Sequence, residues 1–414
     1  MNMTLSLIFV LGFADTTPII DFTPDQVFWK FPPQEMLPGS DTSLETYLND
    51  YGQVTLDGRI LLANRQRILD YGLNGEFRQA VNVEPPKRIL CQTYDADLDQ
   101  YVVSTMLEAN GEKAFFLDFY DADGRLANTS PVAFKYQGVT RSIVQLRYLG
   151  QNRFLVNFWS EKMGHQTQNV HPATLVIAER VGTLTEPVLE PLGDAFDAQW
   201  GSRQVLKNNF KDRWAVFSED GSTCMVAHTI ARDLQVYTAK TIDGKRADDS
   251  FDYTFTKRNP KLDLDFWQSE VPYPSEMREQ AKQQKLGLSG FENVQRWNYF
   301  PSRIRGMYPL EKGLVVLGYT SPNPRHRFYR DNQLWPEEHL ELKNSTSPYL
   351  LTLRTMVLEG NATNKPPELT PDEIVIPGGI LLGTYQDSAF VLVETQVAEK
   401  SFEYELHRID YSSY

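Results

Sequence analysis

The sequence of 414 residues predicts an all-β fold built from small antiparallel sheets that repeat along the chain. Three observations predict it: apolar runs separated by Asp-Gly and Asn-Gly turns, a strand-and-turn unit that recurs, and many aromatic residues. The 20 Tyr, 23 Phe and 7 Trp suit pleated, half-buried strands. A hydrophobic content of 41% and a charged content of 23% are typical of a globular protein with a sizeable core.

The recurrent unit is a strand followed by a turn that ends in glycine. Its clearest copies are Arg67–Gly75 and Phe115–Gly124. Four looser copies follow: Thr174–Gly182, Leu234–Gly244, Leu350–Gly360 and Phe402–Asp410. Such apolar strands with tight turns predict antiparallel hairpins.

A second strand precedes most of these units. Clear examples are Arg59–Ala63, Tyr101–Thr105, Arg153–Phe158, Gly313–Leu317 and Ala389–Val393. In the fourth copy two strands compete for this place, Arg213–Phe217 and Cys224–His228, so its register stays open.

Units of this size cannot bury both faces of their own small sheets. Radial arrangement lets neighbouring units cover one another, which predicts a β-propeller. Six blades fit the units, with seven as the alternative, because the interval between Gly244 and Gly360 is about twice as long as the others. A β-sandwich would show fewer, non-repeating strands, and a parallel α/β fold would show regular βαβ spacing.

Residues 259–300 are predicted to form a helical insertion that accounts for the long interval. Within them, Ser275 is a good N-cap, Glu276 and Glu279 favour the positive helix end, and Gly287 is a good stop. The insertion is expected to decorate the space between blades; the alternative is a lid or docking element beside the propeller mouth.

The units with Asp-Gly and Asn-Gly turns, together with Pro301–Ile304 after the predicted helix, carry a resemblance to a known family. Over most of residues 50–410 the chain resembles the six-bladed β-propellers related to NHL repeats, and among them the secreted bacterial group. The resemblance implies the six-bladed fold and transfers no catalytic residue. The spacing here is less regular than in NHL repeats, which leaves the blade boundaries open.

Residues 1–14 are predicted to be a secretory signal peptide, followed by a single propeller domain at 15–414. Leu5–Phe13 is apolar, too short to span a bilayer, and ends at Ala14 before polar residues. No Lys or Arg precedes it, so a buried N-terminal strand is the alternative. The signal predicts a periplasmic or extracellular protein, and the alternative a cytoplasmic one.

The net charge of −13 disfavours nucleic-acid partners, because phosphates are repelled by such a surface. No other segment is apolar and long enough to cross a membrane. The two cysteines, Cys91 and Cys224, lie in apolar strand patterns and are expected to be buried thiols.

An arginine recurs at the start of a predicted strand in four places: Arg88, Arg141, Arg203 and Arg303. If these strands are innermost, the arginines would surround one mouth of the central channel. Their guanidinium groups could then bind a carboxylate, phosphate or sulfate through bidentate hydrogen bonds. The alternative is that each arginine braces its own blade.

Motifs for metals and catalysis are weak. Asp95–Asp99 has alternating carboxylates but lacks the Gly and distal Glu of a calcium loop, so an acidic hairpin tip is expected. The sequence shows no zinc-type Cys/His cluster, no nucleophile elbow and no phosphate-binding glycine loop. No cofactor is expected.

The sequence favours a binding or scaffolding propeller that recognises a small anionic ligand or a protein partner at the channel mouth. The alternative is a propeller-type hydrolase or lyase with a divalent cation at the same mouth. An enzyme of that kind would need several carboxylates and histidines that converge on one point.

Overall fold

The structure is a computed structural model of the chain. It describes residues 52–63, 65–132, 135–136, 139–140, 142–150, 153–159, 173–179, 213–218, 222–229, 234–239, 241–242, 245–246, 253–258, 262, 264, 302–323, 349–358, 369–398 and 401–412. These residues form strands β1 to β26 and one short 3-10 helix, η3 (Glu311–Gly313). The predicted all-β fold is confirmed.

Six sheets of three or four strands follow one another along the described chain. The first contains β1 (Gly52–Val54), β2 (Arg59–Ala63), β3 (Arg67–Gly72) and β4 (Phe77–Asn82). The second contains β5 (Arg88–Asp95), β6 (Gln100–Ala109), β7 (Glu112–Asp121) and β8 (Leu126–Pro131). The third contains β11 (Ser142–Gly150), β12 (Arg153–Trp159) and β13 (Ala173–Glu179).

The remaining three large sheets have the same layout, with antiparallel neighbours in chain order. The fourth contains β14 (Arg213–Phe217), β15 (Thr223–His228), β16 (Leu234–Ala239) and β19 (Tyr253–Arg258). The fifth contains β20 (Arg303–Pro309), β21 (Leu314–Pro322), β22 (Tyr349–Val357) and β23 (Leu369–Pro377). The sixth contains β24 (Gly379–Tyr385), β25 (Ser388–Ala398) and β26 (Ser401–Asp410). Two small hairpins join β9 (Lys135–Tyr136) to β10 (Val139–Thr140) and β17 (Thr241–Ile242) to β18 (Lys245–Arg246).

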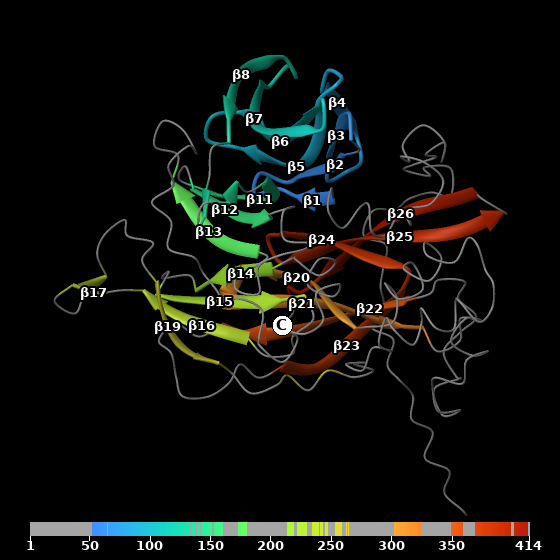
Figure 1. Ribbon diagram of the computed structural model, residues 1–414. Coiled ribbons are helices and arrows are strands. Elements are labelled where there is room, and N and C mark those ends of the chain that lie inside the picture. The colour runs from blue at the N-terminus through green and yellow to red at the C-terminus, as the bar shows by residue number, and fades with distance from the viewer. Residues whose placement is uncertain are drawn as a thin grey trace, which may run out of the picture.

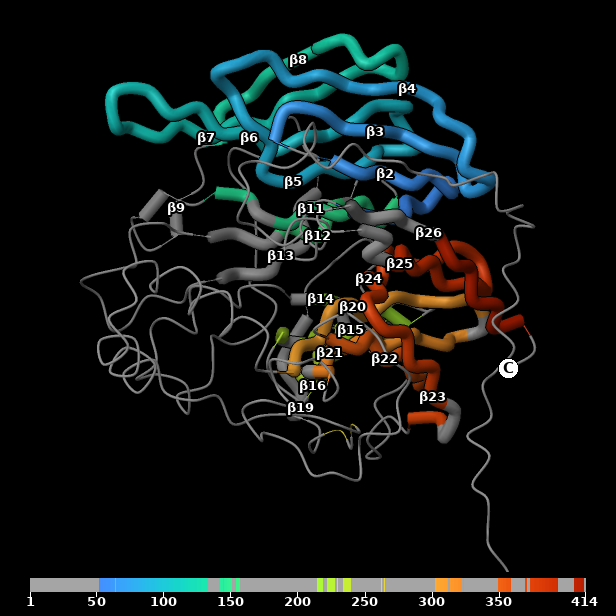
Figure 2. Tube along the Cα trace, turned by 90° about the vertical axis from the view of Figure 1, so that its right-hand side faces the viewer, coloured from blue at the N-terminus to red at the C-terminus, as the bar shows by residue number. Residues whose placement is uncertain are grey.

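The large sheets contact one another in a closed ring (Figures 1 and 2). Contacts join β2 to β5, β5 to β11, β14 to β20, β20 to β24, and β24 back to β1. The third and fourth sheets share a core cluster that includes Leu155, Ala215 and Val226. Because most of these contacts are between first strands, the first strand of each sheet is innermost. This is the architecture of a β-propeller.

Although the described chain contains six large sheets, five blades are recognised in the propeller. The predicted count of six blades is therefore not confirmed, and neither is the relation to NHL repeats. The predicted helix of the 259–300 insertion lies outside the described residues. Of that segment only Leu262 and Leu264 are described, and both are buried in the core cluster shared by the fourth, fifth and sixth sheets.

The predicted hairpins correspond to the second and third strands of the sheets. Their second strands are apolar on both faces because neighbouring sheets cover both; β2 and β6 are buried along most of their length. In the fourth sheet, both competing strands exist. Arg213–Phe217 is β14, the innermost strand, and Cys224–His228 lies within β15, the second, which settles the register that the sequence left open.

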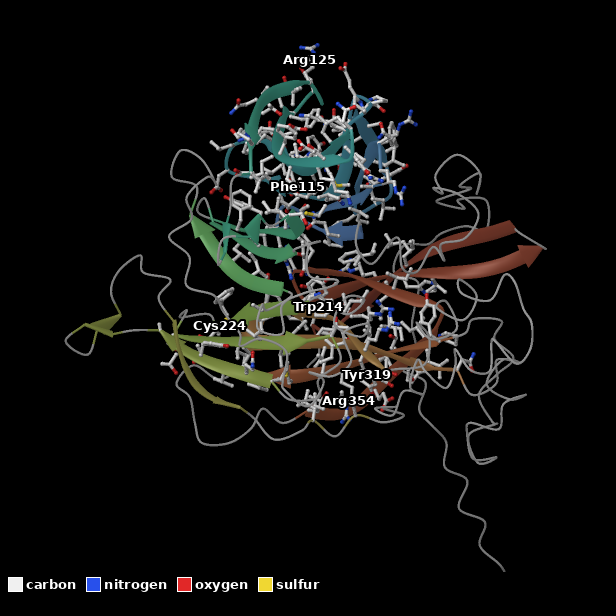
Figure 3. The ribbon with its side chains drawn as sticks, viewed as in Figure 1. Phe115, Arg125, Trp214, Cys224, Tyr319 and Arg354 are labelled. Atoms are coloured by element: carbon white, nitrogen blue, oxygen red, sulfur yellow. The ribbon has the colours of Figure 1, made fainter. Side chains whose placement is uncertain are left out.

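The core is formed by large apolar side chains between sheets, and Figure 3 labels Trp214 and Tyr319 among them. Cys91 and Cys224 are buried thiols, as predicted. The predicted signal peptide lies outside the described residues. Within the described ranges, no helix is long and apolar enough to cross a membrane.

Candidate binding site at one end of the channel

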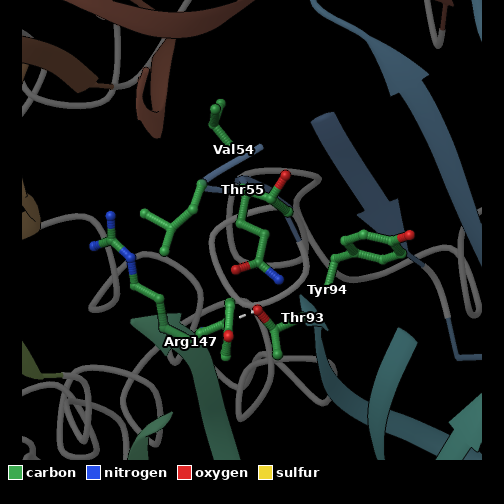
Figure 4. Close-up of a pocket in the computed structure, with 8 residues that line it drawn as sticks. Val54, Thr55, Thr93, Tyr94 and Arg147 are labelled. Atoms are coloured by element: carbon green, nitrogen blue, oxygen red, sulfur yellow. Dashed lines mark hydrogen bonds between the residues drawn. The ribbon is translucent and has the colours of Figure 1, made fainter. Parts of the chain in front are cut away.

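A pocket lies where the first strands of the first, second and third sheets end (Figure 4). Its lining comes from β1 and the turn after it, from the end of β5 and from the end of β11. The lining residues are Gln53, Val54, Thr55, Leu56, Thr93, Tyr94, Arg147 and Tyr148.

Arg147 is the charged residue of this lining. Its guanidinium carbon lies 4.4 Å from the ring centroid of Tyr308, which belongs to β20 in the fifth sheet. The fourth sheet separates the third from the fifth in the ring, so this cation–π contact reaches past the neighbouring sheet. Figure 4 draws Arg147 and Tyr94 on opposite sides of the pocket.

Arg147 is a partly buried cation. Burial lowers the pKa of Arg147, and the nearby Tyr308 partly offsets this effect. Within the described part of the chain, Arg147 has no carboxylate within ion-pair distance; its described charge interaction is the one with Tyr308. A guanidinium has five N–H donors, so Arg147 can bind a carboxylate in addition to its contact with the ring.

Two tyrosines connect the pocket to the turn between β5 and β6. The hydroxyl of Tyr148 donates a hydrogen bond to Asp97, and the hydroxyl of Tyr94 donates one to Asp99. The backbone N–H of Tyr148 also donates to Thr93 Oγ1 at 3.1 Å, which ties β11 to β5. Two of the lining residues are therefore bonded to carboxylates of this turn, which do not themselves line the pocket.

Leu56 covers the pocket from the turn between β1 and β2. Its side chain is 48% exposed, although it is large and apolar. Its Cδ1 atom lies 3.8 Å from the position that a Cβ on Gly150 would take, so it reaches from the first sheet to the end of β11 in the third. The atoms that line the pocket leave no room for a water molecule between them. A ligand can therefore bind only if side chains of the lining move, and the exposed Leu56 is a candidate.

The structure describes two of the four arginines predicted to form an anion site. Arg88 begins β5 and pairs with Glu108 of β6 at 2.5 Å, so it braces its own sheet. Arg303 begins β20 and is buried, with 6% of its surface exposed. Both are at the beginnings of first strands, whereas the pocket lies where such strands end. Arg141 and Arg203 lie outside the described residues, so the ring of arginines stays a prediction.

The carboxylates of Asp95–Asp99 form the turn between β5 and β6, as expected for an acidic hairpin tip. Asp95 is fully buried, and its Oδ1 accepts the backbone N–H groups of Asp97 and Leu98 at 3.1 and 3.2 Å. Across the described ranges, no group of three or more Cys, His, Asp or Glu side chains could hold a metal ion.

Arg147 was not among the residues predicted from the sequence to bind a ligand. The recurrent arginines were found at strand beginnings, and Arg147 lies near the end of its strand. One signal could have found it: Arg147 stands between Leu146 and Tyr148 in an apolar run, where a charged side chain is unusual.

No known protein family matches the chain, and no curated protein matches it by sequence. Among solved structures, it is similar to a member of the DUF4221 family from Bacteroides vulgatus, with 9% identity, a TM-score of 0.49, and coverage of 91% of this chain and 98% of that one. It is similar to the periplasmic gluconolactonase of Pseudomonas aeruginosa, with 8% identity, a TM-score of 0.41 and coverage of 90% of each chain.

It is also similar to regucalcin, a calcium-binding protein from Agrobacterium tumefaciens, with 10% identity, a TM-score of 0.41, and coverage of 91% of this chain and 96% of that one. Likeness at this level assigns no activity to the chain.

Proposed function

We propose that the protein is a binding propeller that holds a small carboxylate ligand at one end of its channel, with Arg147 as the anchor. The observation that carries the proposal is the environment of Arg147. It is a partly buried guanidinium in a pocket lining, and its described charge interaction is with an aromatic ring.

A carboxylate fits this environment better than a dianion. A guanidinium binds a carboxylate through two parallel hydrogen bonds, which restore the interactions that burial has removed. Asp97 and Asp99, which are bonded to the lining tyrosines, repel anions, and the repulsion is about twice as large for a dianionic phosphate. Val54 and Leu56 add apolar surface, which favours a carboxylate with a short alkyl chain.

We also propose that the propeller has six blades, one for each large sheet. The closed order of contacts through β1 and β24 supports this count, since each sheet then has two neighbours. The proposal also includes export from the cytoplasm, which the apolar run Leu5–Phe13 supports.

Binding of 4-methylpentanoate, measured by calorimetry, tests the proposal. We expect the intact protein to bind it and Arg147→Gln to bind it at least about tenfold more weakly, because a charge-assisted hydrogen bond contributes about 1.5–3 kcal/mol. Arg125→Gln is the matched control: Arg125 is 79% exposed and pairs with Asp123 away from the pocket (Figure 3). The proposal fails if the intact protein does not bind the probe or if Arg147→Gln binds it equally well.

A further inference from the structure

We propose that Asn110 is a site of spontaneous covalent modification, where the side chain cyclises onto Gly111 and is converted into isoaspartate and aspartate. This inference goes beyond the proposed function and does not depend on the candidate pocket. It is carried by the different environments of the two Asn-Gly pairs in the sequence, Asn74–Gly75 and Asn110–Gly111.

Asparagine followed by glycine can react without a catalyst, because glycine has no side chain that hinders its backbone nitrogen. The nitrogen of Gly111 attacks Cγ of Asn110, the bond from Cγ to Nδ2 breaks, and ammonia leaves with the proton of the attacking nitrogen. The product is a cyclic succinimide. Water then opens the ring at either of its carbonyl groups, which gives isoaspartate or aspartate and one new negative charge.

The reacting groups of Asn110 and Gly111 are free of hydrogen bonds and exposed. The two residues form the turn between β6 and β7, and both have positive φ, +53° and +78°. Among the residues that the structure describes, none is hydrogen-bonded to the backbone N–H of Gly111 or to the side chain of Asn110. A Cβ added to Gly111 would meet no atom within 4 Å. The turn itself is therefore the main restraint on the reaction.

This turn lies at the end of a hairpin that extends beyond its own sheet (Figure 2). Pairing of β6 with β5 ends at Met106, and pairing of β7 with β8 ends at Phe116. Residues 107–114 thus form a two-stranded ribbon, whose end opens at a lower free energy than a four-stranded sheet. Local opening lets Asn110 rotate out of its turn conformation, so that its Cγ can meet the nitrogen of Gly111.

Asn74–Gly75 is a matched comparison in the same chain, because an apolar residue precedes each pair and a glutamate follows it. Here the reacting groups are bonded. The backbone N–H of Gly75 donates to the carbonyl oxygen of Gly72 at 2.8 Å, and Asn74 Oδ1 accepts the backbone N–H of Glu76 at 3.2 Å. A Cβ added to Gly72 would lie 2.6 Å from the same Oδ1, so the carboxamide packs closely against the strand. Cyclisation at Asn74 must break both hydrogen bonds.

The modification changes the hairpin end and leaves the propeller intact. The new carboxylate lies between Glu108 and Glu112 in the sequence, so this end of the hairpin becomes more acidic. Isoaspartate adds one carbon to the main chain at a turn where neither β5 nor β8 is paired. We therefore expect the modified protein to unfold at the same urea concentration as the unmodified one.

Incubation of the full chain at mildly alkaline pH, followed by proteolysis and mass spectrometry of the peptides, tests the proposal. We expect Asn110 to be converted at least about tenfold faster than Asn74. A tenfold ratio corresponds to about 1.4 kcal/mol, which the two hydrogen bonds at Asn74 can supply. Isoaspartate should be among the products at Asn110, because direct hydrolysis of the carboxamide gives aspartate alone.

The same incubation in guanidinium chloride is the control for local sequence. We expect the two asparagines to react at similar rates in the unfolded chain, since their neighbours match. Asn110→Gln should abolish conversion at the hairpin end and leave the rate at Asn74 unchanged.

Three results would overturn the proposal. The first is equal rates in the folded protein, or faster conversion of Asn74. The second is a product at Asn110 that contains no isoaspartate, which would exclude cyclisation. The third is a tenfold preference for Asn110 that persists in guanidinium chloride, since the fold would then not cause the difference.

Discussion

Asp70 shows how single buried charges join the sheets of this propeller. It is fully buried in β3, and its Oδ2 accepts hydrogen bonds from Arg59 of β2 at 2.9 Å and from the Tyr101 hydroxyl of β6 at 2.5 Å. The same position of the next sheet holds Asp118, which is also fully buried and is paired with Lys87 at 2.8 Å. The carboxylates are paired because an isolated buried charge would destabilise the fold strongly.

The buried tyrosines predict how stability depends on alkaline pH. Burial, followed by the charges of Asp118 and Glu84, raises the pKa of Tyr120 from 10.0 to about 12. Burial and the hydrogen bond to Asp70 raise the pKa of Tyr101 further. Since the folded pKa lies above the unfolded one, the protonated phenols stabilise the fold fully below pH 10, and that contribution is lost as the pH rises through about 12.

Urea unfolding across the alkaline range measures this effect, with tyrosinate absorbance followed in parallel. We expect the free energy of unfolding to fall above pH 10, with the buried phenols ionising only as the chain unfolds. Ionisation of every tyrosine at pH 10 with the fold intact would show that these side chains are exposed to solvent.

At the scale of elements, the sequence predicted the second and third strands better than the first. The second strands Arg59–Ala63 and Cys224–His228 are continuous apolar runs with turn residues beside them, and such runs are local signals. The first strands lie at the axis, where their side chains contact other sheets, as Arg147 contacts Tyr308. A contact between residues so far apart in the chain leaves no local pattern, so the candidate site could not be found from spacing.

The β1–β2 turn carries the cover of the candidate pocket, and Leu56→Ala tests this role. Shortening the side chain should open the pocket without breaking a described hydrogen bond. We expect the association rate of 4-methylpentanoate, measured by stopped flow, to increase, within the ~1–3 decades over which such rates vary among mutants of one site. Leu126→Ala is a control, since Leu126 is 54% exposed on β8 and does not line the pocket. An unchanged rate would mean that Leu56 does not limit access.

Closure of the ring depends on Gly383 in β24. Its φ of +146° is strained for other residues, and an added Cβ would lie 3.2 Å from the Cβ of Val54 in β1. We expect Gly383→Ala to lower the free energy of unfolding by about 1–3 kcal/mol, measured in urea.

Gly111 provides the matched control for this substitution. It also has a positive φ, +78°, but an added Cβ meets nothing within 4 Å. Gly111→Asn should cost less than about 1 kcal/mol, since surface substitutions have small effects and asparagine tolerates this conformation. Equal losses for the two variants would show that β1 and β24 do not pack closely.

At the scale of the whole molecule, the propeller was predictable because its units repeat. Each unit needs neighbours to cover both faces, and a radial ring provides them. The number of blades was harder to predict, because only the contacts of β24 with β1 and β20 show how the ring closes. The strongly acidic balance of the chain was visible in the sequence, but composition cannot show that a partly buried cation lines a pocket.

The central claim is that the end of the channel near Arg147 is the binding site. A crystal structure of the protein with bound 4-methylpentanoate tests it most directly. We expect its carboxylate within about 3 Å of the Arg147 guanidinium and Leu56 displaced from Gly150. A structure with 4-methylpentanoate bound elsewhere, Arg147 still on Tyr308 and the pocket closed would contradict it.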